Sequence, residues 1–412
     1  MLSYALRTCD PEFAGQATAD FDQVMREQIG RIQGAPLSDT SNLQRTLRVD
    51  DEQGVSGGGL GIPFAEDMAP VCFAASTQAT AQLQSAIFAA HGLTLTPRDN
   101  TSAKNLLLGK MSQENLDDGL RAPKVKAALS RFVALHNAEA LKTKLASHDG
   151  DAFNKKAAQI QVARFNSLQL PKAGAWVYTL PISGTRLAMS SAAFKTALQL
   201  RLGANIFEEG QLCKCCHEPM DVYGLHALQC KKGAAGLTYR HDRMRDYWYF
   251  AAKKSGKLVP KKETPGLLGD NRRPGDIWME NYFDGAHAFD FVVTSPCCAS
   301  NYVAASQGVG KSAEKAYRSK MENSAAACRA EGFMFTPVAL EAFGGWHKDS
   351  LKEMKRFAEA CVPVRSELED VEKAKNRIFQ EFSVKFQQIT AEMIIARMYL
   401  NAHVCFKTRG PP

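Results

Sequence analysis

The 412-residue sequence has no apolar run approaching the roughly 18 residues that a membrane-spanning helix requires. Its N-terminus, MLSYALRTCDPEF, lacks the basic flank and the long apolar core of a secretory signal. We therefore expect an intracellular protein with no membrane partner. The composition, 45% hydrophobic and 23% charged residues, is typical of a folded protein with two or three domains.

A complete phosphate-binding loop is also missing. The segment Gly57–Gly61 is followed by Ile62-Pro63 instead of the Gly-Lys-Ser/Thr that begins a helix in such a loop. A second segment, from Ala305 to Ser312, has Gly310-Lys311-Ser312 but lacks the first glycine, which permits the tight turn around phosphate. Nucleotide hydrolysis at this second segment remains the weaker alternative.

The cysteines do not suggest a disulfide framework, because the 11 of them are odd in number and unevenly spread. Four potential ligands instead follow the pattern Cys213-x2-Cys216-x9-His226-x3-Cys230. Zinc takes four such ligands tetrahedrally, and a set of three thiolates and one imidazole is closed and structural. Cys215 could replace Cys216 as the second ligand. The sequence predicts a zinc-binding module here, with coincidental free cysteines as the alternative.

A basic block follows this cluster. Residues 231–280 hold twelve Lys/Arg and six Asp/Glu, so the block carries +6 of the whole chain's net charge of +8. Such a block suits a polyanion, since neutralised phosphates release counterions. On charge alone, a solvated surface explains it equally well. The basic residues of the block are Lys231, Lys232, Arg240, Arg243, Arg245, Lys253, Lys254, Lys257, Lys261, Lys262, Arg272 and Arg273.

The second half of the chain predicts a small α/β core of α+β class. A basic, aromatic helix over 240–254 precedes three strands, over 257–263, 275–280 and 286–295. The last two strands form a hairpin around Phe283-Asp284-Gly285, whose Asp-Gly supplies the turn. A helix over about 306–331, a strand over 334–343 and helices from about 348 to the end follow. Helices flank the resulting mixed sheet.

Two carboxylates stand on the hairpin strands. Asp276 begins one strand, and Asp290 lies in the apolar run 288–293, where an unpaired acid is costly to bury. Both can converge on one Mg²⁺, with Glu263 at the end of the first strand as a third ligand. The alternative is that Asp290 is a salt-bridged core acid and Asp276 a turn residue.

If this metal site cleaves phosphodiesters, it also needs a cation near the attacking water. Val292 stands two residues after Asp290, where a lysine is expected. The helix that follows offers Lys311, Lys315 and Lys320 as substitutes.

Together these residues resemble the C-terminal half of site-specific non-LTR retrotransposon proteins. That family has a Cys-Cys-His-Cys knuckle, an Arg-His-Asn/Asp triplet, a Pro-Asp element and an Asp about a dozen residues later. The triplet matches Arg240-His241-Asp242, and 13 residues separate Asp276 from Asp290. The helix 315–320 resembles the one that carries the family's displaced lysine, which favours Lys320. Gly275 stretches the Pro-Asp pair by one residue, and Met321 follows Lys320 where a tyrosine is common.

The resemblance extends upstream and sets the expected domain organisation. Gly57–Ile62 with residues 65–69 is similar to the segment just past the polymerase thumb, and 193–202 to the linker helix before the knuckle. The expected ranges are a polar N-terminal segment (1–56), a helical region (57–205), the zinc knuckle (206–235), a restriction-enzyme-like core (236–345) and C-terminal helices (346–412). The polymerase's aromatic-x-Asp-Asp box is absent, so no reverse transcription is expected from what looks like a truncated or rearranged element product.

The resemblance implies an Mg²⁺-dependent nuclease in the nucleus that nicks double-stranded DNA, a nick that primes reverse transcription of element RNA. Asp276 and Asp290 would hold the metal, Glu263 would assist, and Lys320 would orient water or stabilise the phosphate. The DNA backbone would be gripped by Arg240, His241, Arg243, Arg245, Arg272 and Arg273. The alternative function is a catalytically inactive, zinc-containing nucleic-acid-binding remnant.

Overall fold

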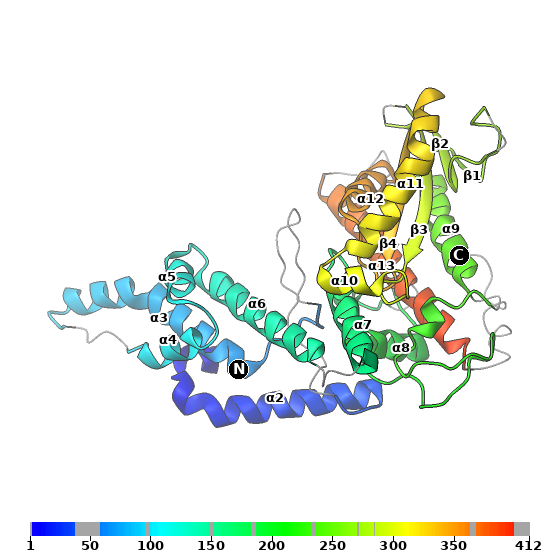
Figure 1. Cartoon of the computed structure of the whole chain (residues 1–412). Coiled ribbons are helices and arrows are strands. Elements are labelled where there is room, and N and C mark those ends of the chain that lie inside the picture. The colour runs from blue at the N-terminus through cyan, green and yellow to red at the C-terminus, as the bar shows by residue number, and fades with distance from the viewer. Residues whose placement is uncertain are drawn as a thin grey trace. The chain divides into compact units, whose positions relative to one another are not determined.

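The computed structural model describes residues 2–37, 58–94, 99–147, 152–182, 187–232, 236–269, 272–283, 285–362 and 368–398. Gly57, the predicted turn residue Asp284 and the last residues, 399–412, lie outside these ranges. The chain divides into two compact units, one formed by Met1–Leu47 with Gly59–Leu145 and the other mainly by Ala146–Pro412 (Figure 1). The division falls inside the range 57–205, which the sequence analysis took as one helical region.

The first unit is helical. Its core gathers residues from α1, α3, α4, α5 and α6, among them Leu6, Phe73, Leu107 and Leu129. The elements are α1 (Leu2–Thr8), α2 (Pro11–Gln33), α3 (Ala65–Ala90), α4 (Thr101–Leu108), α5 (Gln113–Arg121) and α6 (Val125–Ala146).

The start of α3 is held from α2. Both carboxylate oxygens of Asp22 accept hydrogen bonds, from the N–H groups of Ala65 (2.7 Å) and Glu66 (3.0 Å). These N–H groups have no partner within their own helix, so a carboxylate satisfies them and favours the positive end of the helix dipole. The polar N-terminal segment thus packs with the helices that follow it.

The second unit combines helices with one sheet. Its helices are α7 (Ala152–Leu168), η1 (Ala175–Tyr178), α8 (Ser191–Leu202), η2 (His226–Leu228), α9 (Leu237–Ser255), α10 (Tyr302–Gln307), α11 (Lys311–Ala330), α12 (Lys348–Ala360) and α13 (Leu368–Ile395). Its strands are β1 (Pro260–Lys262), β2 (Ile277–Tyr282), β3 (Gly285–Thr294) and β4 (Met334–Glu341). The predicted helix over 306–331 is in fact two helices, because Gly310 adopts a left-handed conformation (φ 75°) and starts α11 anew.

The predicted mixed sheet is present, in the order β1-β2-β3-β4. β1, β2 and β3 are antiparallel neighbours, whereas β3 and β4 are parallel and joined through α10 and α11. The chain is therefore of mixed α+β class, as the hydrophobic patterns predict.

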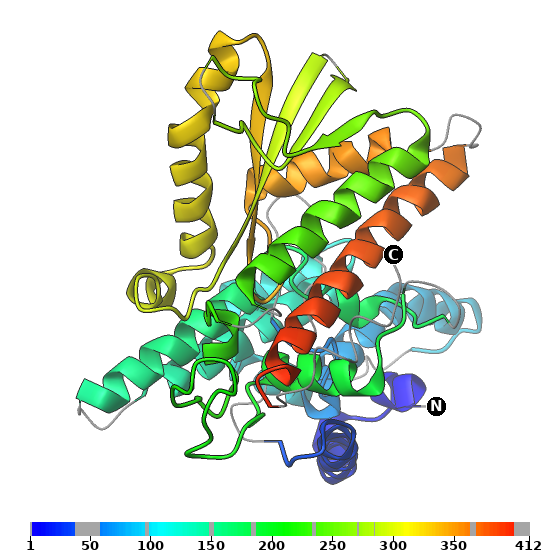
Figure 2. The same ribbon diagram turned by 90° about the vertical axis from the view of Figure 1, so that its right-hand side faces the viewer.

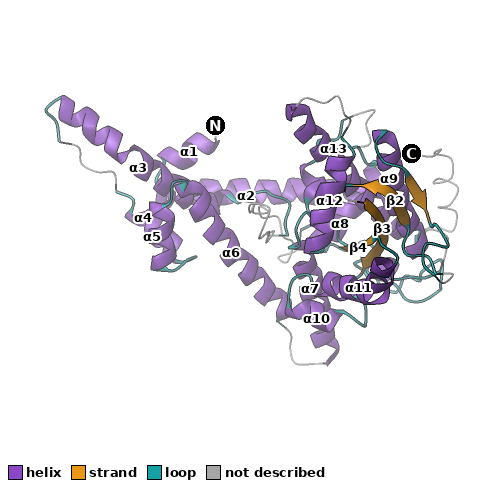
Figure 3. Cartoon of the chain, turned by 90° about the horizontal axis from the view of Figure 1, so that it is seen from above, coloured by secondary structure: helices purple, strands orange, loops and turns teal. Residues whose placement is uncertain are grey.

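The two faces of the sheet are covered by different helices (Figures 2 and 3). On one face, Trp248 of α9 stacks on Phe357 of α12 with 3.9 Å between ring centroids, over Phe289 and Phe291 of β3. Phe382 and other residues of α13, which lies beside α9 in Figure 2, complete this cluster. On the other face, residues of α11 pack against Trp278 of β2, Ala288 of β3 and Phe335 of β4.

Candidate functional site

Asp276 and Asp290 lie beside each other on the hairpin. Ile277 pairs with Phe289 and Trp278 with Ala288, so the two acids are the residues next to the Ile277–Phe289 pair. Their carboxyl groups are near enough for each to influence the pKa of the other.

Backbone contacts fix the position of Asp276. Its N–H donates to the carbonyl oxygen of Phe289 at 2.8 Å, and its Oδ2 accepts the N–H of Phe291 at 2.6 Å. Both the backbone and the side chain of Asp276 are therefore held by β3, although Asp276 precedes the first residue of β2.

The close approach of the chain at Asp276 to β3 requires a glycine at position 275. A Cβ atom at position 275 would lie 2.6 Å from the carbonyl oxygen of Phe289, a distance that real side chains do not show. The residue that stretches the Pro-Asp element of the family by one is thus the residue that lets the two strands meet at the acids.

Lys320 reaches the acid pair from α11. Its Nζ lies 2.7 Å from Oδ2 of Asp290, and the lysine side chain is 36% exposed while that of the aspartate is 13% exposed. Of the other two lysines proposed from the sequence, Lys315 instead donates to Ser300 and Asn301, both at 3.2 Å. Lys311 is exposed at the start of the helix.

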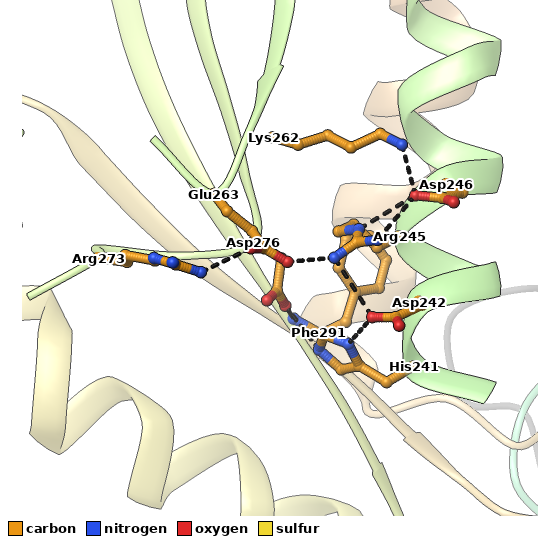
Figure 4. A network of polar contacts seen from close by, with 9 residues as sticks. All are labelled: His241, Asp242, Arg245, Asp246, Lys262, Glu263, Arg273, Asp276 and Phe291. Carbon is orange, nitrogen blue, oxygen red and sulfur yellow. Dashed lines mark hydrogen bonds and ion pairs between the residues drawn. The ribbon is translucent and has the colours of Figure 1, made fainter. Parts of the chain in front are cut away.

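His241 of α9 contacts the other acid. Its Nε2 lies 3.0 Å from Oδ2 of Asp276, and its Nδ1 lies 3.4 Å from Oδ1 of Asp242 (Figure 4). The hydrogen bond with Asp276 raises the pKa of the imidazole above its usual value, which outweighs the opposing effect of burial. His241 was expected to grip the DNA backbone, whereas here it is bound to the acid pair.

The two carboxyl groups have different pKa values. Burial raises the pKa of Asp290 to about 6, and the nearby Asp276 adds to this effect, while Lys320 opposes it. Burial also acts to raise the pKa of Asp276, but hydrogen bonds from His241 and Phe291 outweigh it, so that this pKa is lowered. Two neighbouring acids that titrate apart in this way are typical of functional sites.

Glu263 does not join the acid pair. One of its oxygens is bound by Arg245 and the other by Arg273, the latter at 2.6 Å (Figure 4). Its backbone has a left-handed conformation (φ 45°), and its N–H donates to the carbonyl oxygen of Asp276 at 3.0 Å. In this arrangement, the proposed third metal ligand acts as a partner of arginines.

Of the six residues predicted to contact DNA, Arg240 does not fit the prediction. It is 2% exposed, and burial lowers the pKa of its guanidinium to about 10. A side chain buried beneath α9 does not reach a phosphate. The reason is the position of α9, which packs its Arg240–Met244–Trp248 face into the protein.

The other predicted DNA contacts lie nearer the surface. Arg245 is bound to Asp242, Asp246 and Glu263, with 12% of its side chain exposed. Arg273 is 59% exposed although it pairs with Glu263. Arg243 lies over the ring of Tyr239, 5.8 Å from its centroid, and Arg272 is exposed.

The cysteine cluster forms a compact candidate metal centre. The ligand atoms of Cys213, Cys216, His226 and Cys230 all lie within 4.8 Å of one another. The Cys213 and Cys230 sulfurs are 4.0 Å apart, and the Cys216 sulfur lies 3.2 Å from His226 Nε2. Zinc–sulfur bonds of about 2.3 Å arranged tetrahedrally require separations of this size. The cluster could bind a metal such as zinc, and it takes Cys216, not Cys215, as its second cysteine.

Local turns explain how the cluster forms. His217 adopts a left-handed conformation (φ 63°) and its N–H donates to the carbonyl oxygen of Cys213, which closes the first turn. Asp221 accepts the N–H groups of Tyr223, Leu225 and His226, and so fixes the start of the second turn. Asp221 was not predicted from the sequence, although Asp side chains commonly accept the N–H two residues on in a turn.

Among the described residues, the cysteine cluster is the only group of three or more His, Cys, Asp or Glu side chains arranged to hold one metal ion. It is also part of the second unit's interior, since its side chains pack with Phe207, Phe343 and Ile394. Arg397, fully buried after α13, donates to the carbonyl oxygens of Cys230 and Lys232.

The alternative phosphate loop before α11 is filled by a protein side chain. Glu341 of β4, 1% exposed, accepts hydrogen bonds from the N–H groups of Ser312 and Ala313. These are the N–H groups that a bound phosphate would need at a helix start. Nucleotide binding at this segment is therefore not supported.

A comparison with known protein families finds no match to this chain, and a comparison with curated proteins finds no relative. Within the described ranges, every helix is too short or too polar to cross a membrane.

Proposed function

We propose that the chain is a metal-dependent nuclease that nicks one strand of double-stranded DNA. The observation that carries the proposal is the meeting of Asp276, Asp290 and Lys320, which come from the residue before β2, from β3 and from α11. Two acids and a lysine gathered in this way have the chemistry that phosphodiester hydrolysis requires.

The acid pair suits Mg²⁺ by its chemistry. Mg²⁺ prefers carboxylate oxygens, commonly one or two, and keeps water in its remaining positions. Asp276 and Asp290 would supply these oxygens, since the two side chains lie beside each other on the hairpin. A divalent ion bound there would polarise a phosphoryl oxygen and lower the pKa of a water molecule.

Lys320 and His241 would act beside the metal ligands. The Lys320 ammonium, released from Asp290, can donate to a phosphoryl oxygen or orient a water molecule. His241, bound to Asp276 at 3.0 Å, would hold that carboxylate in the orientation that the pair needs. Glu263 would act indirectly, by fixing Arg245 and Arg273.

The cysteine cluster would hold Zn²⁺ in a structural role. Three thiolates and one imidazole leave no open position, so the ion would stabilise the fold and not the reaction. Lys231 and Lys232, which follow Cys230, are both exposed and would face phosphates.

The resemblance noted in the sequence supports a retrotransposon origin and a nuclear place of action. A nick made by such a protein would prime the copying of element RNA, which makes double-stranded DNA the first partner and element RNA the second. The motifs that support this origin are the ones just described, with the spacing of Asp276 and Asp290 foremost.

A catalytically inactive nucleic-acid-binding remnant is the second candidate. It is favoured by one observation: the acids are already engaged, Asp276 by His241 and Asp290 by Lys320. The test is nicking of supercoiled plasmid in Mg²⁺ or Mn²⁺ by the wild type and by Asp290→Asn. Nicking by the wild type alone, with DNA binding by both, supports the nuclease; binding without nicking by either supports the remnant.

A further inference from the structure

Two aromatic rings and two lysines form a partly exposed group at the C-terminal end of α9 and on β1. Lys262 Nζ lies 4.6 Å from the ring centroid of Tyr249 and 5.2 Å from that of Phe250. Lys253 Nζ lies 6.0 Å from the centroid of Tyr249. We call these four residues the aromatic–lysine patch.

The rings of the patch are half-buried, so each retains a surface open to solvent. They meet edge to face, with 5.3 Å between their centroids and 79° between their planes. Tyr249 rests against the core beneath α9, whereas Phe250 is not among the residues of that core. Aromatic side chains beside a positively charged surface bind unpaired bases by stacking.

The surroundings of the patch are basic. Lys253, Lys254 and Lys257 are exposed, and none of them makes an ion pair with a carboxylate in the described part of the chain. Lys262 pairs with Asp246 at 2.7 Å, with 32% of the lysine side chain exposed. Several cations thus remain available beside the two rings.

The patch is close to the acid pair. On the sheet, Lys262 is paired with Ile277, the residue after Asp276. Along α9, Tyr249 stands eight positions after His241, which contacts Asp276, and this corresponds to a rise of about 12 Å. That length corresponds to a few nucleotides of one strand, at roughly 3.4 Å each in a duplex.

We propose that the aromatic–lysine patch binds single-stranded nucleic acid, with bases stacked on Tyr249 and Phe250 and phosphates bound by Lys253 and Lys262. The proposal rests on the proposed function, from which it takes the class of ligand. Bases within a duplex present their faces only to each other, so aromatic platforms favour unpaired strands. The patch would therefore hold a strand that has left the duplex beside the cleavage site.

The neighbouring lysine on β1 provides a matched control. Lys261 points to the other face of the strand and pairs with Glu280, 48% and 56% exposed. Lys262→Gln and Lys261→Gln remove the same charge from adjacent positions, but only the first acts on the patch. Phe250→Ala removes one ring, and Phe250→Trp keeps an aromatic platform.

The experiment measures fluorescence anisotropy with a 20-nucleotide oligo-dT, an oligo-rU of equal length and a duplex, using the full chain with Asp290→Asn to prevent cleavage. We expect Phe250→Ala to weaken binding of oligo-dT by about 5-fold to 150-fold, from a stacking energy of about 1–3 kcal/mol per base. Lys262→Gln should also weaken binding, because it removes a phosphate contact. Lys261→Gln and Phe250→Trp should stay within about twofold of the parent. Comparison of oligo-dT with oligo-rU shows which strand the patch prefers.

The proposal is overturned if oligo-dT and oligo-rU bind no more tightly than the duplex, or if the two glutamine variants behave alike. It is also overturned if Phe250→Ala binds as well as its parent while its thermal unfolding is unchanged. The absence of nuclease activity is a separate result. If the chain never nicks DNA but shows the expected pattern of binding, the nuclease proposal fails and the aromatic–lysine patch proposal stands.

Discussion

Lys320 Nζ lies 2.7 Å from Asp290 Oδ2, although the lysine belongs to α11 and the acid to β3. Val292 stands two residues after Asp290, where a lysine is expected. Lys320 of α11 supplies a cation to the Asp290 carboxylate instead. This contact makes Lys320 the lysine whose removal should affect catalysis most.

Lys320→Ala should lower the rate of plasmid nicking by about 10² or more, the size of effect seen when a donor to transition-state charge is removed. Lys315→Ala is the matched control on the same helix, because Lys315 bonds to Ser300 and Asn301 instead. The measurement is the single-turnover nicking rate in Mg²⁺. Equal rates for both variants would show that Lys320 is only a partner of a buried acid.

Cys213→Ser should abolish binding of one zinc ion per chain, whereas Cys215→Ser should leave it intact. Three thiolates and His226 surround the proposed ion, and Cys215 stands outside this group. Zinc quantitation on the purified variants gives the answer directly. Because the cluster packs with Phe207 and Phe343, loss of the ion should also lower the thermal stability of the second unit. A fully loaded Cys213→Ser protein, or an empty Cys215→Ser protein, would contradict the assigned ligands.

Gly275→Ala should destabilise the hairpin and weaken nicking, since the added Cβ would meet the carbonyl oxygen of Phe289 at 2.6 Å. Relief of this clash requires β2 and β3 to separate at Asp276, and overpacking of this kind typically costs about 1–3 kcal/mol. Thermal unfolding and nicking are both measured. Gly15→Ala is the control, because a Cβ at that helical position meets no atom within 4 Å. Wild-type behaviour of Gly275→Ala would mean that the strands do not approach so closely.

His287 should make the stability depend on pH. It is 5% exposed, and burial lowers its pKa to about 4, from 6.5 in the unfolded chain. The folded state therefore keeps the imidazole neutral, and its contribution is complete above pH 6.5 and lost as the pH falls toward 4. The shift corresponds to about 3 kcal/mol.

The corresponding measurement compares the free energy of unfolding of the wild type and His287→Gln from pH 7.5 to pH 4. The wild type should lose about 3 kcal/mol more than the variant over this range. Taking the difference removes the effect of other groups, such as Asp290, whose raised pKa acts in the opposite direction. Parallel curves for the two proteins would show that His287 titrates normally in the folded state.

Short-range patterns were enough to predict the sheet and the acid pair. Alternating apolar residues fix the faces of β2 and β3, and the hairpin places these strands side by side, with a shift in register between Met279 and Tyr282. The cysteine cluster was predictable for the same reason, because all four ligands lie within two adjacent turns.

The contacts of α9 could not be predicted in this way. Its polar and basic residues occur all around the helix, so the sequence does not tell which side is buried. Packing against the sheet, α12 and α13 decides that Arg240 is inside and that Arg245 meets Glu263. The same is true of Glu341, whose partners at the start of α11 come from a distant part of the chain.

We expect Asp276 and Asp290 to share one divalent ion. Crystals of the protein grown with Mn²⁺, measured near the manganese absorption edge, test it directly. We predict an anomalous peak between the two carboxylates, about 2.1–2.3 Å from an oxygen of each, and no such peak in Asp290→Asn. Well-ordered carboxylates with no peak at saturating Mn²⁺, still bound to His241 and Lys320, would contradict it.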